Sequence, residues 1–261
     1  MNDGITVYGA ATCEDTAITR SRLEALGVPY RYVDIDEDPA GAAEATRLSG
    51  RRVTPTIVRE AAGVVADHDA EPSIERVDAF ARAAGASVEP PGGEQLHGAV
   101  ISRAVPIRTL EAAGGGTFSL AERRGRRAAA LFFGHPVDCL ACFGYAKQLA
   151  RQAADLDEVD ADPIVVVPGG VAEAAGWLHE LPAGTVTLAD PDGAWRREVG
   201  QAIDRPADGV LLVLVDRFAA PRVAAAAAEA GGLVAPAEAT SWLRFVALDC
   251  PECSGEIAWP E

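Results

Sequence analysis

The sequence is poor in lysine, methionine and aromatic side chains, and its basic residues are few. Lys147 is the only lysine, Met1 is the only methionine, and Phe, Trp and Tyr make up 6% of the 261 residues. Lys and Arg number 23 against 39 Asp and Glu, which gives a formal net charge of −16. A negative field of this size repels phosphates and anionic lipid headgroups. The composition therefore argues against nonspecific binding to nucleic acid or to a membrane surface.

Long apolar segments and targeting signals are also missing. The longest apolar runs, such as VLLVLV at 210–215, fall far short of the roughly 18 residues that cross a bilayer. The N-terminus has no basic segment followed by an apolar core, which a secretory signal needs. The glycine runs at 114–116 and 169–170 lack the lysine of a phosphate-binding loop. We therefore expect a cytoplasmic protein with no membrane span and no bound nucleotide.

The apolar content of 49% is enough for substantial cores, and the length suits two domains of ordinary size. Residues 1–84 alternate β-prone and helical segments in the order βαβαβ(β)α. Residues 85–102 are rich in proline and glycine and predict a linker. A second α/β pattern covers residues 103–249, and residues 250–261 form a tail. The sequence thus predicts two α/β domains in tandem.

Three segments of the second domain give specific structural expectations. Residues 139–157 favour one helix. The alanine-rich run at 222–230 is ambiguous, because alanine favours a helix while the preceding buried strand favours a hairpin partner. Residues 236–248 predict an amphipathic helix with Trp242, Phe245 and Val246 facing inward.

The cysteines carry the clearest chemical signal. There are five, and four of them form C-x-x-C pairs while the fifth lies in C-x-x-T: Cys13, Cys139, Cys142, Cys250 and Cys253. A static disulfide framework is not expected in a reducing compartment. The cysteines are therefore candidates for catalysis or metal binding.

Cys13 stands where a predicted strand ends and a helix begins. Amide groups at a helix start carry partial positive charge and favour a thiolate. Thr16 is three residues further on, where its hydroxyl could donate to the sulfur. Glu14 and Asp15 act in the opposite direction, since nearby carboxylates disfavour a second anion.

The first domain resembles glutaredoxins, especially their mycoredoxin-like branch, in the segments VYGAATCEDT, YRYVDIDEDP, VTPT and EPSIERV. The resemblance implies that Cys13 is the nucleophile and that the proline of VTPT is cis and faces it. It also implies that Thr12, Thr16, Thr54 and Pro55 contact the substrate.

Position 16 departs from dithiol glutaredoxins, which have a second cysteine there. Thr16 excludes a disulfide within this domain, so the resemblance implies a monothiol route that attacks a mixed disulfide with a small thiol. The alternative is a redox-inactive glutaredoxin fold that serves as a binding or structural module.

The pair Cys139–Cys142 directly follows an apolar strand and begins a helix. Residues i and i+3 of a helix have Cβ atoms roughly 5–6 Å apart, which suits a disulfide that opens and closes. Cys139 would attack from the helix end, and Cys142, one turn deeper, would resolve the mixed disulfide. His135 could accept a proton, while Asp138 opposes thiolate formation. Half of a metal site and a static disulfide are the alternatives for this pair.

The second domain resembles the redoxin group of thioredoxin-like and peroxiredoxin-like proteins. The segments FSLAERRGRRAAALFF and LADPDGAWRREVG carry the resemblance, together with the cysteine helix. It implies a second thioredoxin fold. Pro136 replaces the hydroxyl residue of peroxidases, and Gly209 and Val210 stand where those enzymes have an arginine. Both departures argue against a peroxidase.

The tail sequence DCPECSG resembles half of a zinc knuckle. Structural zinc usually takes four ligands, so Cys250 and Cys253 would need a second pair. A redox relay to Cys139 and Cys142, a metal site and an incidental pair all remain open.

The sequence as a whole predicts a thiol–disulfide oxidoreductase of cell redox homeostasis with no tightly bound cofactor. A low-molecular-weight thiol such as mycothiol or glutathione would donate electrons, and small thiols or protein disulfides would be the partners. The alternatives are a thiol peroxidase with Cys139 as the peroxidatic residue, and a C-x-x-C protein that binds zinc or acts as a scaffold. The sequence predicts no oligomeric state.

Overall fold

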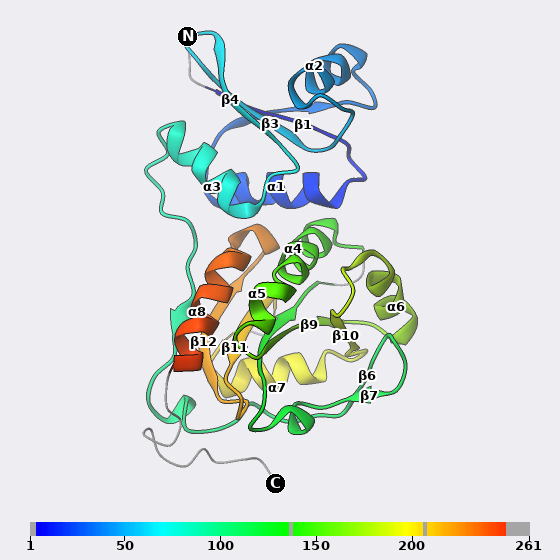
Figure 1. Cartoon of the computed structure of the whole chain (residues 1–261), viewed down its shortest axis with the longest axis vertical. Helices are drawn as coiled ribbons and strands as arrows, with labels where there is room; N and C mark the ends of the chain where they lie inside the picture. Colours follow the sequence, from blue (N-terminus) through cyan, green and yellow to red (C-terminus); the bar gives the residue numbers. More distant parts are fainter. Residues whose placement is uncertain (1–3, 136–137, 206–207, 249–261) are drawn as a thin grey trace. The chain divides into compact units, whose positions relative to one another are not determined.

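The computed structural model describes residues 4–135, 138–205 and 208–248. The chain divides into two compact units, the first built mainly from residues up to Pro91 and the second mainly from Gly92 onward. Each unit contains one principal β-sheet with helices packed on it (Figure 1).

The first unit has a four-stranded sheet in the order β2-β1-β3-β4. Strand β1 pairs in parallel with β2 and antiparallel with β3, which in turn pairs antiparallel with β4. Its elements are β1 (Gly4–Gly9), α1 (Glu14–Ala25), β2 (Tyr30–Asp34), α2 (Pro39–Ser49), β3 (Thr56–Ala61), β4 (Val64–Ala70) and α3 (Ile74–Ala83).

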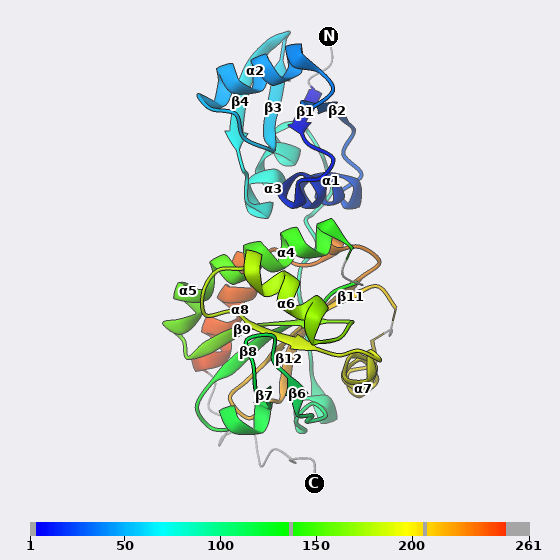
Figure 2. The same cartoon turned by 90° about the vertical axis from the view of Figure 1, so that its right-hand side faces the viewer.

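The alternation of side chains along β1 and β3 gives this sheet two apolar faces. Ile5, Val7 and Ile57 pack with residues of α1 and α3. Tyr8 and Val58 pack with residues of α2. Figures 1 and 2 show the same arrangement, with α1 and α3 on one face and α2 on the other.

The second unit has a six-stranded sheet in the order β10-β9-β8-β11-β12-β5. Strands β8, β9 and β10 are parallel, whereas β11 pairs antiparallel with both β8 and β12. The sheet strands are β5 (Glu94–Gln95), β8 (Ala128–Phe133), β9 (Ala161–Val167), β10 (Val186–Ala189), β11 (Val210–Val215) and β12 (Pro221–Ala227). The helices are α4 (Leu140–Arg151), α5 (Ala153–Asp157), α6 (Val171–Glu180), α7 (Ala194–Ala202) and α8 (Pro236–Leu248).

Helices cover both faces of this sheet, which explains why its central strands are continuously apolar. Figures 1 and 2 show α4 and α7 on opposite faces. Trp195 and Val199 of α7 pack in the core beneath Leu131 and Phe133. A small hairpin, β6 (Leu110–Glu111) and β7 (Thr117–Phe118), lies between β5 and β8 in the sequence. Both units have the mixed α/β architecture of a thioredoxin fold, so the predicted fold class of two such domains in tandem is confirmed.

Side chains placed just before the helices explain several of their start points. Asp38 accepts hydrogen bonds from the amides of Ala40 and Gly41 at 3.0 Å, and so caps α2. In the LADPDG segment, buried Asp190 accepts from the amides of Trp195 and Arg196 at 3.2 and 3.1 Å, at the start of α7. This segment, which carried part of the redoxin resemblance, therefore has a structural role.

Two sequence expectations differ from the structure, and one segment that was left open adopts the hairpin alternative. The single helix expected over 139–157 is two helices, because the chain turns at Gln152 before it enters β9. The ambiguous run at 222–230 lies mostly in β12, since pairing with β11 and β5 overrides the helix propensity of alanine. The segment predicted as a linker at 85–102 contains β5 and the buried Leu96, so part of it belongs to the second unit.

Helix α8 also corrects one predicted core residue. Phe245 was expected to face inward, but it is 56% exposed and makes an edge-on contact with Trp242. Leu243 and Val246, three residues apart, are the buried residues of this turn. The apolar stripe of the helix is therefore rotated away from Phe245.

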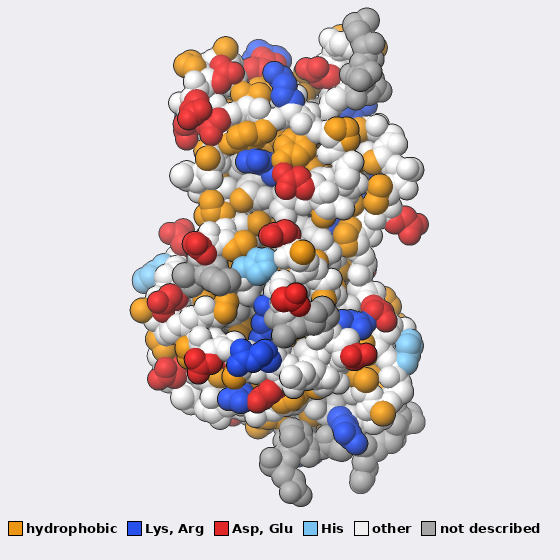
Figure 3. All heavy atoms as spheres, turned by 180° about the vertical axis from the view of Figure 1, so that it is seen from behind, with side chains coloured by type: hydrophobic (Ala, Val, Ile, Leu, Met, Phe, Trp, Pro, Cys, Tyr) orange, Lys and Arg blue, Asp and Glu red, His pale blue; other side chains and the backbone are white. Residues whose placement is uncertain are grey.

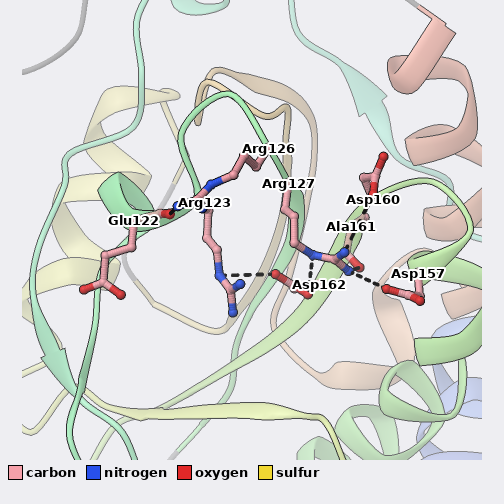
Figure 4. A network of polar contacts seen from close by, with 8 residues as sticks. All are labelled: Glu122, Arg123, Arg126, Arg127, Asp157, Asp160, Ala161 and Asp162. Carbon is pink, nitrogen blue, oxygen red and sulfur yellow. Dashed lines mark hydrogen bonds and ion pairs between the residues drawn. The ribbon is translucent and has the colours of Figure 1, made fainter.

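An ion-pair network ties together the starts of β8 and β9 (Figure 4). The Arg127 guanidinium lies 2.9 Å from the Asp162 carboxylate and 3.0 Å from that of Asp157, and it donates to the Ala161 carbonyl at 2.9 Å. Asp162 also pairs with Arg123 at 3.5 Å. Strand β8 begins at this network and runs toward Cys139. The network therefore stabilises the end of the sheet that lies opposite to the cysteine pair.

Several exposed side chains of opposite charge form ion pairs on the surface. On the face drawn in Figure 3, acidic and basic side chains lie close to one another among apolar ones. Arg76 lies 2.9 Å from Asp67 and 3.0 Å from Asp69, and Arg52 lies 2.6 Å from Asp36. Exposed pairs of this kind contribute at most about 1 kcal/mol each. In the part of the chain that is described, no helix combines the length and apolarity required to traverse a bilayer.

Candidate active site

Cys13 lies at the residue just before α1, where its side chain is half-buried. The chain reaches this point from β1 through a turn that is closed by a hydrogen bond from the Cys13 amide to the Ala10 carbonyl at 3.1 Å. The sulfur is therefore at the positive end of the α1 dipole. Glu14 and Asp15 follow in the first turn and oppose that effect.

The Thr54–Pro55 segment faces Cys13, as the glutaredoxin resemblance implied. The peptide bond between these two residues is cis, and the Cys13 thiol donates to the Thr54 carbonyl at 3.5 Å. The Pro55 carbonyl accepts from the Glu71 amide at 2.8 Å, which fixes this turn to the segment after β4. Thr54 is half-buried, Pro55 is buried and Thr12 is exposed. The structure thus brings Thr54 and Pro55 together with Cys13.

Thr16 does not make the contact expected of it. Its side chain is 1% exposed, and its hydroxyl has no hydrogen-bond partner among the described residues. A Cβ built on Gly9 would lie 2.4 Å from the Thr16 Cγ2 atom, so the threonine packs closely over the end of β1. The structure therefore places Thr16 in the core rather than at the surface where a substrate would bind.

The second pair of cysteines lies at the junction of β8 and α4. Cys139 immediately precedes α4 and is half-buried, whereas Cys142 is the third residue of the helix and is 0% exposed. His135 follows β8, and its Nδ1 atom lies 3.7 Å from the Cys139 sulfur. One ligand atom from each of His135, Cys139 and Cys142 lies within 4.8 Å of the other two.

The position of this cluster follows from the topology of the sheet. Strand β8 is central, with β9 and β10 on one side and β11 and β12 on the other. Sites in open α/β sheets form where the strand order reverses, at the carboxyl ends of the strands. His135 and Cys139 lie between β8 and α4 at that point, and Cys142 lies in the first turn of α4.

A shallow pocket of about 400 Å³ adjoins His135 and was not foreseen from the sequence. Gly209 and the alanines at 226–228 line it. Gly209 has a φ of +75°, and a Cβ there would lie 2.2 Å from the Ala227 carbonyl oxygen, so a larger residue does not fit. The sequence signal for this pocket was the glycine directly before a buried apolar strand. That glycine points to a pocket only once β12 is known to lie beside it, and the sequence left β12 ambiguous.

Cys250 and Cys253 lie outside the described residues, as does Pro136. The predicted relay or metal role of the tail pair therefore stays a prediction. Asp138 is exposed beside Cys139, where its carboxylate opposes a second negative charge.

Comparison with known proteins gives one family match and several similar folds. Residues 5–60 match the glutaredoxin family model, so the first unit contains a glutaredoxin domain. A search of curated proteins found no match.

Solved structures with a related fold include three bacterial proteins. Peroxidoxin BcpB from Mycobacterium tuberculosis has 16% identity and a TM-score of 0.46, over 60% of this chain and 99% of that one. A putative thiol:disulfide interchange protein DsbE from Chlorobium tepidum has 16% identity and a TM-score of 0.43, over 62% and 100%. AhpC from M. tuberculosis has 18% identity and a TM-score of 0.46, over 62% and 96%. Fewer than one residue in five is shared in each case, so the activities of these proteins do not transfer to this chain.

Proposed function

We propose that this chain is a thiol–disulfide oxidoreductase of cell redox homeostasis, with a monothiol site at Cys13 and a dithiol site at Cys139 and Cys142. The observation that carries the proposal is the arrangement of the dithiol, with a half-buried Cys139 ahead of α4 and a fully buried Cys142 one turn into it. The glutaredoxin match over residues 5–60 supports a thiol function for the first site.

At the dithiol site, the Cys139 thiolate attacks one sulfur of a substrate disulfide. The substrate S–S bond breaks, a mixed disulfide forms, and the leaving sulfur takes a proton. The Cys142 thiolate then attacks the Cys139 sulfur and releases the second substrate thiol. Two electrons pass to the substrate, and a Cys139–Cys142 disulfide remains. His135, whose Nδ1 atom is 3.7 Å from the Cys139 sulfur, is placed to accept the Cys139 proton before the attack.

At the monothiol site, Cys13 attacks a mixed disulfide between a substrate and a small thiol. Thr16 cannot resolve the product, so a second small thiol must release Cys13. The contact of the Cys13 thiol with the Thr54 carbonyl, beside the cis Thr54–Pro55 peptide bond, supports a substrate-contacting role for this turn. A low-molecular-weight thiol such as mycothiol or glutathione fits the role of electron donor for this cycle.

Trapping of the mixed disulfide tests the division of roles between Cys139 and Cys142. The test uses a full-length Cys13→Ser, Cys250→Ser, Cys253→Ser protein, so that only the dithiol can react. Adding Cys142→Ser should accumulate a long-lived mixed disulfide at Cys139 with a disulfide-bonded peptide, because the resolving thiol is gone. Adding Cys139→Ser instead is the matched control and should trap nothing, since Cys142 is 0% exposed. Peptide mass mapping identifies the linked cysteine.

Two results would replace the proposal. A mixed disulfide that forms at Cys142 in the Cys139→Ser protein would reverse the two roles. Catalytic consumption of peroxide by the reduced protein, lost on Cys139→Ser, would identify the second unit as a thiol peroxidase instead.

A further inference from the structure

The cluster of His135, Cys139 and Cys142 also offers a set of metal ligands. Besides serving as a proton acceptor, His135 brings a ring nitrogen next to the two sulfurs, and one ligand atom of each residue lies within 4.8 Å of the others. His135 and Cys139 lie between β8 and α4, and Cys142 lies in the first turn of α4.

The separation between the Cys139 sulfur and the His135 ring nitrogen matches that of a tetrahedral metal centre. Zinc binds thiolate sulfur at about 2.3 Å and imidazole nitrogen at about 2.0–2.1 Å, which places a sulfur and a nitrogen ligand about 3.6 Å apart. The Cys139 sulfur and the His135 Nδ1 atom are 3.7 Å apart. Two thiolates and one imidazole form a donor set that suits zinc and disfavours magnesium or calcium, which prefer oxygen.

We propose that the reduced dithiol, together with His135, binds one zinc ion and that oxidation of the dithiol releases it. Three protein ligands leave the fourth position open to water or to the sulfur of a small thiol. The release step balances: the zinc-bound thiolate pair reacts with one substrate disulfide and two protons. The products are the Cys139–Cys142 disulfide, two substrate thiols and free Zn²⁺. The site thus holds either the metal or the Cys139–Cys142 disulfide, never both.

The open coordination position and the half-buried Cys139 make the metal exchangeable rather than permanent. This inference goes beyond the proposed exchange activity and does not depend on it, because zinc affinity is measured without any disulfide substrate.

Metal titration of the full-length chain tests the inference. The protein carries Cys13→Ser, Cys250→Ser and Cys253→Ser, so the only thiols left are Cys139 and Cys142. After reduction and removal of metal, it is titrated with Zn²⁺ against a chromogenic chelator, and separately with Co²⁺. We expect one ion per chain and a sulfur-to-cobalt charge-transfer band of tetrahedral intensity. Stoichiometric oxidation to the disulfide should release the ion.

Matched variants identify the ligands. His135→Ala should weaken zinc binding by at least about 10-fold, whereas His179→Ala, which removes an exposed histidine of α6, should leave it unchanged. Binding that is unaffected by His135→Ala would overturn the three-ligand site. The three-ligand site would also be overturned if the unmodified chain binds zinc and loses that binding when only Cys250 and Cys253 are replaced. The tail would then hold the metal. Far-UV circular dichroism of each variant separates lost ligation from unfolding.

Discussion

At the residue scale, Cys13 and Cys139 occupy the same local position with different neighbours. Each immediately precedes a helix that follows a buried strand. Three residues later the side chain points into the core in both cases: Thr16 is 1% exposed and Cys142 is 0% exposed. The chemistry of that one buried position separates the two sites. A sulfur there can resolve a mixed disulfide, and a hydroxyl cannot.

The buried hydroxyl of Thr16 gives a prediction about stability. It has no hydrogen-bond partner among the described residues, so its burial is not compensated. Thr16→Val keeps the shape of the side chain and removes the polar atom. We expect the free energy of unfolding of the first unit to rise by about 1 kcal/mol, with exchange at Cys13 unchanged. Far-UV circular dichroism in urea and a small-disulfide exchange assay measure the two quantities.

Gly9→Ala is the control for this prediction, because it crowds the same contact. The new Cβ would lie 2.4 Å from the Thr16 Cγ2 atom, and overpacking of this kind costs about 1–3 kcal/mol. Slower exchange at Cys13 in the stable Thr16→Val protein would show that the hydroxyl acts on the sulfur, contrary to the packing described here.

At the element scale, the hairpin that joins β11 to β12 is built around a buried carboxylate. Asp216 is 4% exposed and accepts from the amides of Phe218 and Ala220 at 2.8 and 3.0 Å. Burial raises the pKa of the Asp216 carboxyl, and this outweighs the opposing effect of the two amides and of Arg222 and Arg217. The Arg222 guanidinium is 3.8 Å away.

This raised pKa makes the stability of the second unit depend on pH. The folded state holds the Asp216 proton more tightly than the unfolded chain, where an aspartate titrates near 3.9. The resulting stabilisation is complete below that value and is lost as pH rises through the folded pKa. Asp216→Asn keeps an oxygen for the two amides but carries no charge. We therefore expect the stability of the variant relative to wild type to increase from about pH 4 toward neutrality.

Urea titrations at several pH values, followed by tryptophan fluorescence, measure this difference. All four tryptophans follow residue 91, so the signal does not report on the first unit. Asp208→Asn, at an exposed position of the same unit, is the control. A difference in stability that does not change with pH would contradict the account of Asp216.

Elements with local signals were predictable, while those decided by distant pairing were not. Helix α2 is an example with a local signal, since it begins at Pro39, a residue that is favoured in the first turn of a helix. Strand β12 and the inward face of α8 depend on which partners cover them, and no local pattern carries that information. The same limit applies to the site. The spacing of Cys139 and Cys142 indicated their proximity, but the pocket at Gly209 needs the β11–β12 pairing.

At the scale of the whole molecule, the cysteines are divided between the two units. Cys13 is the only cysteine among residues 1–91, and the two C-x-x-C pairs come later in the chain. Each unit has its own sheet and its own cysteine at the start of a helix. The two proposed thiol reactions should therefore be separable by mutation.

Cys13→Ser tests this separation in the full-length chain. A serine hydroxyl is a poor nucleophile toward sulfur at neutral pH, so the variant should lose the reduction of small mixed disulfides. The Cys139–Cys142 pair should still oxidise at the wild-type rate, as counted by alkylation and mass spectrometry on a Cys250→Ser, Cys253→Ser background. The reciprocal protein, Cys139→Ser with Cys142→Ser, should keep the small-disulfide activity. If Cys13→Ser retains that activity in full, the reaction belongs to another cysteine. If the unmodified chain also lacks it, the glutaredoxin domain is a redox-inactive module.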